Sequence, residues 1–236
     1  MALIFDGEAI ETTAHVIDWR SHGLQFIPGK HKNVGKRVSP PQLCVVHYTG
    51  GENPPPVVYK TLIARELSVE FAMDLHGTIY QFADPATTFC AHCRGMNVVS
   101  FGIEVQCRGL SKPPTPALKN TWAKWDVEVP RGAYVEELTW PGTKKSAQLH
   151  TQRVSYASFT ADQLSALVEF FTSLVDAKII PARVPANARV RFGLETDKVQ
   201  GFKGVAGHYH FSAEKFDPGP QLFDELLDEG FSPAKR

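Results

Sequence analysis

The sequence lacks most of the features that mark membrane, secreted or disulfide-stabilised proteins. None of its segments approaches the roughly 20 consecutive apolar residues that span a bilayer. Its first eight residues turn acidic after Phe5 and lack the basic segment and long apolar run of a secretory signal. Four cysteines in 236 residues are too few for a disulfide scaffold. We therefore expect a cytoplasmic product without membrane insertion, which would need release by another agent to act outside the cell.

The chain also lacks an excess of charge of either sign. Lys plus Arg and Asp plus Glu number 25 each, so net charge gives no reason to expect a nucleic-acid partner or an anionic membrane surface. With 43% hydrophobic residues, a chain of this length can bury one sizeable core. We expect a single domain over residues 1–236 and a monomer, whose partner must be inferred from a site.

A structural zinc site is poorly supported by the cysteines. Cys90-Ala91-His92-Cys93 resembles half of such a site, but a second Cys or His pair at finger-like spacing is missing. Reduced, partly buried thiols are the preferred interpretation.

The stretch 207–220 concentrates groups that can do chemistry: His208, His210, Lys215 and Asp217. An imidazole nitrogen and a carboxylate oxygen are ordinary zinc ligands, and hydrolytic zinc sites use three protein ligands with one open position. This stretch could supply two of the three. The alternative is a surface turn with a solvated lysine and carboxylate, and a third ligand elsewhere would favour the metal site.

The end of this stretch predicts a rigid corner. Pro218-Gly219-Pro220 stops any extended segment, and Pro220 can occupy the first turn of a helix over residues 221–227. Lys215 lies two residues before Asp217, so in an extended backbone both side chains would point to the same side.

A third ligand candidate lies near the start of the domain. Residues 43–47 form a short apolar run that ends in His47, and a glycine-containing loop follows. This pattern predicts a buried strand that delivers His47 at its C-terminal end, where α/β folds place ligands.

A carboxylate stands out on a second predicted strand, over residues 100–106. Phe101, Ile103 and Val105 alternate with Gly102, Glu104 and Gln106, so one face is apolar and Glu104 lies on the other. Glu104 is either a paired structural charge or, in an enzyme, a general base.

Further elements follow from local patterns. Prolines before residues 57–65 predict a helix start, and residues 69–74 and 78–82 predict a hairpin with His76 exposed at its turn. Thr160 and Gln163 form a capping box for an amphipathic helix that should cover the sheet, and residues 205–208 predict a short strand.

Two regions show weaker patterns. Residues 6–40 have few periodic apolar runs, which predicts an irregular N-terminal arm over residues 1–40, with His15, His22 and His31 as surface or packing residues. Residues 108–158 predict an inserted loop region with a hairpin that forms part of a groove wall. Its tryptophans either stack on sugar or pack internally: Trp122, Trp125 and Trp140.

Several ordered motifs together resemble the zinc-dependent N-acetylmuramoyl-L-alanine amidases of the type 2 family, which include peptidoglycan recognition proteins and phage lysozyme-amidases. The motifs are Val46-His47-Tyr48-Thr49, His76-Gly77-Thr78-Ile79-Tyr80-Gln81, Ala91-His92, Asn97-Val98-Val99-Ser100-Phe101-Gly102-Ile103-Glu104, Gly207-His208 and Lys215-Phe216-Asp217-Pro218-Gly219-Pro220. The resemblance covers roughly residues 43–107 and 160–228. It implies an α/β fold with a central mixed sheet flanked by helices.

The resemblance also implies a site. One zinc ion per chain would be held by His47, His208 and Asp217, although His210 is a competing imidazole. Family members use either a tyrosine on the first hairpin strand or a glutamate on the central strand as catalytic helper. Val69 stands where we align that tyrosine, so this chain resembles the glutamate type, with Glu104 as the base.

The function that the resemblance implies is hydrolysis of the amide bond between N-acetylmuramic acid and L-alanine. Lys215 matches the family's lysine and would help to stabilise the oxyanion. His92 either lines the cleft, positions a neighbouring group or only packs. We expect an endolysin with antimicrobial action on the cell wall. The alternatives are a recycling amidase for soluble muropeptides and a peptidoglycan-binding protein without activity.

Overall fold

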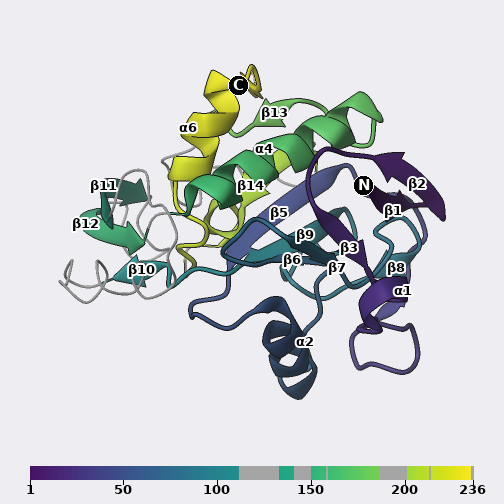
Figure 1. The fold of residues 1–236 in the computed structure, drawn as a ribbon. Helices are drawn as coiled ribbons and strands as arrows, with labels where there is room; N and C mark the ends of the chain where they lie inside the picture. The colour runs from purple at the N-terminus through teal and green to yellow at the C-terminus, as the bar shows by residue number, and fades with distance from the viewer. Residues whose placement is uncertain (112–132, 141–149, 158, 187–200, 213, 235–236) are drawn as a thin grey trace.

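A mixed six-stranded sheet forms the centre of the molecule (Figure 1). The computed structural model describes all residues except 112–132, 141–149, 158, 187–200, 213 and 235–236. The central strands, in spatial order, are β14 (Gly204–Gly207), β5 (Leu43–Tyr48), β9 (Ser100–Val105), β6 (Phe71–Met73), β7 (Ile79–Gln81) and β3 (Val16–Asp18). β6 and β7 pair antiparallel and the other neighbours pair parallel. This confirms the α/β fold with a mixed sheet.

Short strands and helices surround this sheet. Three two-stranded pairs are β1 (Ala2–Phe5) with β2 (Glu8–Glu11), β4 (Gly35–Lys36) with β8 (Thr88–Phe89), and β13 (Arg183–Val184) with β15 (Ser232–Pro233). A separate sheet contains β10 (Leu110–Ser111), β12 (His150–Ala157) and β11 (Ala133–Trp140). The helices among the described residues are α1 (Trp19–His22), α2 (Pro55–Ala64), α4 (Ala161–Asp176), the 3-10 helix η1 (His208–His210) and α6 (Gln221–Asp228).

Helices cover both faces of the central sheet (Figure 1). The capping box of Thr160 and Gln163 starts α4, as predicted, and its apolar stripe packs on Phe71 and Phe101. On the opposite face α2 packs through Val58 and Leu62. Because parallel strands covered on both sides lie away from water, β5 and β9 read as nearly continuous apolar runs. A polar side chain on either strand is therefore conspicuous.

The prediction of an irregular N-terminal arm is wrong for residues 2–22. These form the β1–β2 hairpin, then β3, which is the edge strand of the central sheet, and then α1, whereas residues 23–34 contain no helix or strand. Gln81 fixes the hairpin, because its side-chain amide bonds the backbone N–H and C=O of Ile4. The three N-terminal histidines have surface or packing positions as predicted: His15 is exposed, and His22 and His31 contact aromatic rings.

Other predicted elements are confirmed, with small shifts. The strand at residues 43–47, the helix after the prolines, the hairpin with exposed His76 and the hairpin within 108–158 are all present. Trp122 and Trp125 lie outside the described residues, and so does the side chain of Trp140. Pro220 is the N-cap of α6 rather than part of its first turn. The stretch after Gly207 turns into η1 instead of continuing extended.

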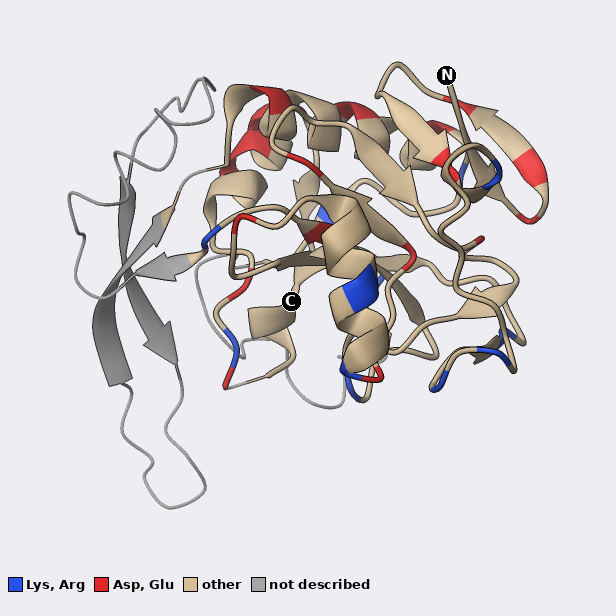
Figure 2. Cartoon of the chain, turned by 60° about the horizontal axis from the view of Figure 1, so that its bottom comes forward, with Lys and Arg blue, Asp and Glu red and all other residues tan. Residues whose placement is uncertain are grey.

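The described part of the chain contains no helix with the length and apolar character needed to cross a membrane. Figure 2 shows acidic residues on α4, α6 and the β1–β2 hairpin, and basic residues on α2 and on separate loops.

Candidate metal centre and pocket

Three parallel strands place polar side chains at one edge of the sheet. His47 lies opposite Glu104 in the register of β5 and β9, so both side chains point to the same face. His208 directly follows β14, which pairs with β5 on its other side. The carboxyl ends of these strands therefore bring together a histidine, a carboxylate and a second histidine, at the position where open α/β sheets place ligands.

Asp217 reaches the same edge through a tight loop closure. The backbone N–H of Tyr209 donates to the C=O of Asp217 at 3.1 Å. A Cβ at Gly207 would collide with the ring of Pro218. A glycine at position 207 thus allows the chain around Asp217 to pack directly against the start of η1.

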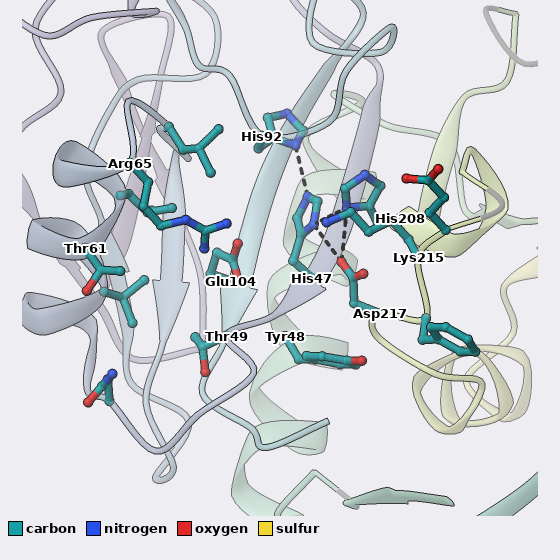
Figure 3. A pocket seen from close by; sticks show the side chains of 16 residues that line it. His47, Tyr48, Thr49, Thr61, Arg65, His92, Glu104, His208, Lys215 and Asp217 are labelled. Carbon is teal, nitrogen blue, oxygen red and sulfur yellow. Dashed lines mark hydrogen bonds and ion pairs between the residues drawn. The ribbon is translucent and has the colours of Figure 1, made fainter. Parts of the chain in front are cut away.

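The side chains of His47, His208 and Asp217 converge on one point (Figure 3). Asp217 Oδ2 lies 2.9 Å from His47 Nδ1 and 3.2 Å from His208 Nδ1, and the two Nδ1 atoms are 3.0 Å apart. Ligands of a tetrahedral zinc ion with bonds of about 2.0 Å lie about 3.3 Å apart. The triangle is close to one face of that tetrahedron, so the donor set and its spacing fit zinc.

All three side chains are buried, and the pKa values of His47 and Asp217 are shifted. His47 is 3% exposed, and burial lowers its pKa to about 4 against the opposing hydrogen bond to Asp217. Burial acts against ionisation of Asp217, but hydrogen bonds from His208 and His47 outweigh it and hold its pKa well below the usual range. A neutral imidazole beside a carboxylate is the ionisation state that binds a metal ion.

Glu104 lies beside this group with an oxygen available for chemistry. Its Oε2 atom is buried and has no hydrogen-bond partner among the described residues. Burial and the charge of Asp217 raise the pKa of Glu104 to about 8, against the opposing charges of Lys215 and Arg65. A carboxyl group with a pKa near neutrality can both accept and donate a proton at neutral pH.

A cavity of about 330 Å³ opens over these residues. Lys215 lines it together with Asp217, although residues 215–217 have no regular structure. Both side chains therefore face the cavity, as expected. An irregular backbone places them there, and not the extended backbone on which the expectation was based. The structure brings all five predicted site residues to this cavity: His47, Glu104, His208, Lys215 and Asp217.

Sequence patterns missed one wall of the cavity. Thr61, Leu62 and Arg65 line it from α2 and the residue that follows, and Figure 3 shows Arg65 pointing toward Glu104. The helix itself was predictable, but its orientation on the sheet depends on packing between distant segments. The charged residue at its C-terminal end was the one available signal.

The competing ligand candidates lie elsewhere. His210 Nδ1 accepts a hydrogen bond from the backbone N–H of Gly207 at 2.9 Å, and its ring packs on Tyr209 and Phe223. All four cysteines are free and buried, which confirms the thiol interpretation. Within the described part of the chain, Cys90 and Cys93 belong to no group of three metal-ligand residues.

Comparison with known proteins gives one family match. The family model described as N-acetylmuramoyl-L-alanine amidase matches residues 37–127, a range that includes His47 and Glu104 and ends before His208. No curated protein sequence matches the chain.

Solved structures share the fold. The endolysin N-acetylmuramoyl-L-alanine amidase LysCS from Clostridium intestinale URNW is 13% identical, with a TM-score of 0.50, and the match covers 93% of this chain and 97% of that one. Peptidoglycan recognition protein SD from Drosophila is 14% identical, with a TM-score of 0.50 and coverage of 94% and 98%. At such identities the likeness concerns the fold alone.

Proposed function

Since the chain belongs to the type 2 N-acetylmuramoyl-L-alanine amidase and peptidoglycan recognition protein family, whose amidase model matches residues 37–127, we propose that it is a zinc-dependent amidase. Membership of the family supports hydrolysis or binding of peptidoglycan. The observation that carries the enzymatic proposal is the buried triangle of His47, His208 and Asp217 beside the available oxygen of Glu104. A buried carboxyl group of raised pKa beside three metal-ligand atoms favours catalysis over binding alone.

The proposed substrate bond joins the lactyl carbonyl of N-acetylmuramic acid to the amine of L-alanine. His47, His208 and Asp217 would hold one zinc ion per chain, which when bound would supply Lewis-acid chemistry that acidifies water and polarises a carbonyl group. Glu104 accepts a proton from the attacking water. It then returns a proton to the leaving amine as the C–N bond breaks, so the products are a lactyl carboxylate and a free L-alanine amine.

Lys215 would act on the charge that develops at the carbonyl oxygen. Lys215 lines the cavity, and its positive charge contributes to the lowered pKa of His47 and opposes the increase in the pKa of Glu104. A fixed cation beside a developing oxyanion lowers the energy of the transition state more than that of the ground state.

Lys215→Ala is expected to lower turnover by about 100- to 1000-fold, with zinc retained and KM little altered. Lys215→Arg should recover only part of the activity, because a planar guanidinium presents its charge differently from a compact ammonium. Turnover and zinc affinity are measured on the same preparation. If Lys215 only pairs with Asp217, zinc affinity falls instead and turnover at saturating zinc stays near the wild-type value.

We propose an endolysin role, with intact cell wall as the substrate. Residues 108–158 add a separate sheet, β10–β12–β11. This addition favours an extended polymer as the substrate over a small soluble fragment. The alternative substrate is a soluble muropeptide, as in recycling. Comparing initial rates on intact sacculi and on soluble muropeptides tests this choice. Faster hydrolysis of sacculi supports the endolysin role, and hydrolysis restricted to soluble fragments contradicts it.

A further inference from the structure

A second histidine, His92, contacts the ring of His47 on the side away from the metal-ligand atoms. His47 Nδ1 faces His208 and Asp217, and His47 Nε2 lies 3.1 Å from His92 Nδ1 (Figure 3). The rings of His47 and His92 meet edge to face, with centroids 5.3 Å apart.

The contacts permit one consistent placement of protons. A metal ligand at Nδ1 of His47 requires the proton of that ring on Nε2, where it donates to His92 Nδ1. The proton of His92 then lies on Nε2, which is 3.3 Å from Ser100 Oγ. Ser100 Oγ in turn donates to the C=O of Met96 at 2.8 Å. In this series of hydrogen bonds from His47 to Met96, each donor thus faces an acceptor.

A glycine on β9 makes room for the ring of His92. A Cβ at Gly102 would lie 2.7 Å from His92 Nδ1 and 2.9 Å from a methyl group of Val69. Both distances are shorter than real Cβ contacts, so His92 could not occupy this place beside any larger residue. The glycine is required for packing, since its φ angle is not among the positive values of the chain.

The surrounding loop is fixed by a buried ion pair. Asn97 Oδ1 accepts the backbone N–H groups of His92 and Cys93. Arg37 bonds the C=O groups of Asn97 and Ser100 and pairs with Glu70, whose second oxygen accepts the N–H of Gly102. The segment that carries His92 and the strand on which it rests therefore share one hydrogen-bonded frame.

We propose that His92 is a positioning residue for the metal centre, which accepts the Nε2 proton of His47 and so leaves Nδ1 of His47 free and correctly aimed for zinc. This inference rests on the zinc site of the proposed function. Groups that orient a metal-ligating histidine in this way contribute about 10- to 100-fold to metal affinity.

His92→Leu and His92→Asn form a matched pair for this test. Leucine fills the space without an acceptor, whereas asparagine places an oxygen near the position of Nδ1. Zinc affinity is measured by competition with a chromogenic chelator, and the absorption spectrum of the cobalt form reports the ligand geometry. We expect His92→Leu to lose about 10- to 100-fold in zinc affinity with a shifted cobalt spectrum, and His92→Asn to recover most of both.

Gly102→Ala tests the same contact without removing the imidazole. The added methyl group would displace His92, so zinc affinity should fall in the range of His92→Leu. Gly35→Ala is the control, because a Cβ at this strand glycine meets only Phe89, at 3.9 Å. Thermal unfolding of the metal-free proteins shows whether each variant is folded.

The outcomes separate this inference from the proposed function. If the wild-type protein binds no zinc, the metal site itself fails. If the wild type binds zinc and a folded His92→Leu variant binds it equally tightly with an unchanged cobalt spectrum, the positioning role is overturned. Lost turnover in a folded His92→Leu variant, with unchanged zinc affinity and an unchanged cobalt spectrum, would instead assign His92 a direct contact with the substrate, and would also overturn the inference.

Discussion

Glu104→Gln is expected to lower turnover by about 100-fold or more while zinc content stays at one ion per chain. The amide keeps the shape of the carboxyl group but cannot accept a proton from water. The side chain points into the cavity beside the metal-ligand atoms, and its Oε2 atom has no partner in the described part of the chain. The variant therefore removes proton transfer with little change to the ligand triangle.

The measurement combines steady-state kinetics on a soluble muropeptide with metal analysis of the same sample. Arg65→Gln is a useful comparison, since it removes a charge that opposes the raised pKa of Glu104 and leaves the carboxyl group in place. Activity of Glu104→Gln equal to that of the wild type would remove Glu104 from the mechanism. It would then stand as a structural carboxylate, the other interpretation that its strand allows.

Replacing a metal ligand should have the larger effect. His47→Ala or His208→Ala is expected to abolish stoichiometric zinc binding, and with it all measurable hydrolysis. Each imidazole supplies one of three donor atoms that lie within 3.2 Å of one another. Losing one leaves two protein ligands, fewer than the three on which hydrolytic zinc sites depend. Metal analysis after dialysis against a weak chelator tests this result.

Two kinds of control separate ligand loss from general damage. His76→Ala removes an exposed histidine at the β6–β7 turn, and Cys90→Ser with Cys93→Ser removes the thiols of the half-motif. Both should retain the zinc content of the wild type. Full zinc occupancy in His47→Ala and in His208→Ala would exclude the site proposed here.

The sequence predicted the side chains that depend on strand periodicity. His47 and Glu104 lie on apolar strands where one polar residue interrupts the pattern, so their face and their place near the strand ends could be inferred locally. The contact of Asp217 with His208 could not, because spacing alone fits a surface turn equally well. The contact depends on the close packing of Pro218 against Gly207, which has no side chain. These two residues are too far apart in the sequence for a periodic pattern to predict their contact.

The parts that were missed depend on long-range pairing. β3 has three residues, too few to show alternation, and it is a strand because it pairs with β7. Two hydrogen bonds between the Gln81 side chain and the Ile4 backbone fix the β1–β2 hairpin, which precedes β3, across a separation of 77 residues. Arg65 reaches the cavity, and His92 reaches His47, through the docking of α2 and of the loop before β9 on the sheet.

The identity of the bond cut in a defined muropeptide tests the central claim most directly. The zinc-loaded protein is incubated with N-acetylmuramoyl-tripeptide, and the products are separated and sequenced from the amine end. We predict one new free amine, on L-alanine, together with intact N-acetylmuramic acid, and loss of both products when zinc is removed by chelation. Tight binding of the muropeptide by the zinc-loaded protein without any new amine, or cleavage at another bond, would contradict the assignment as an N-acetylmuramoyl-L-alanine amidase.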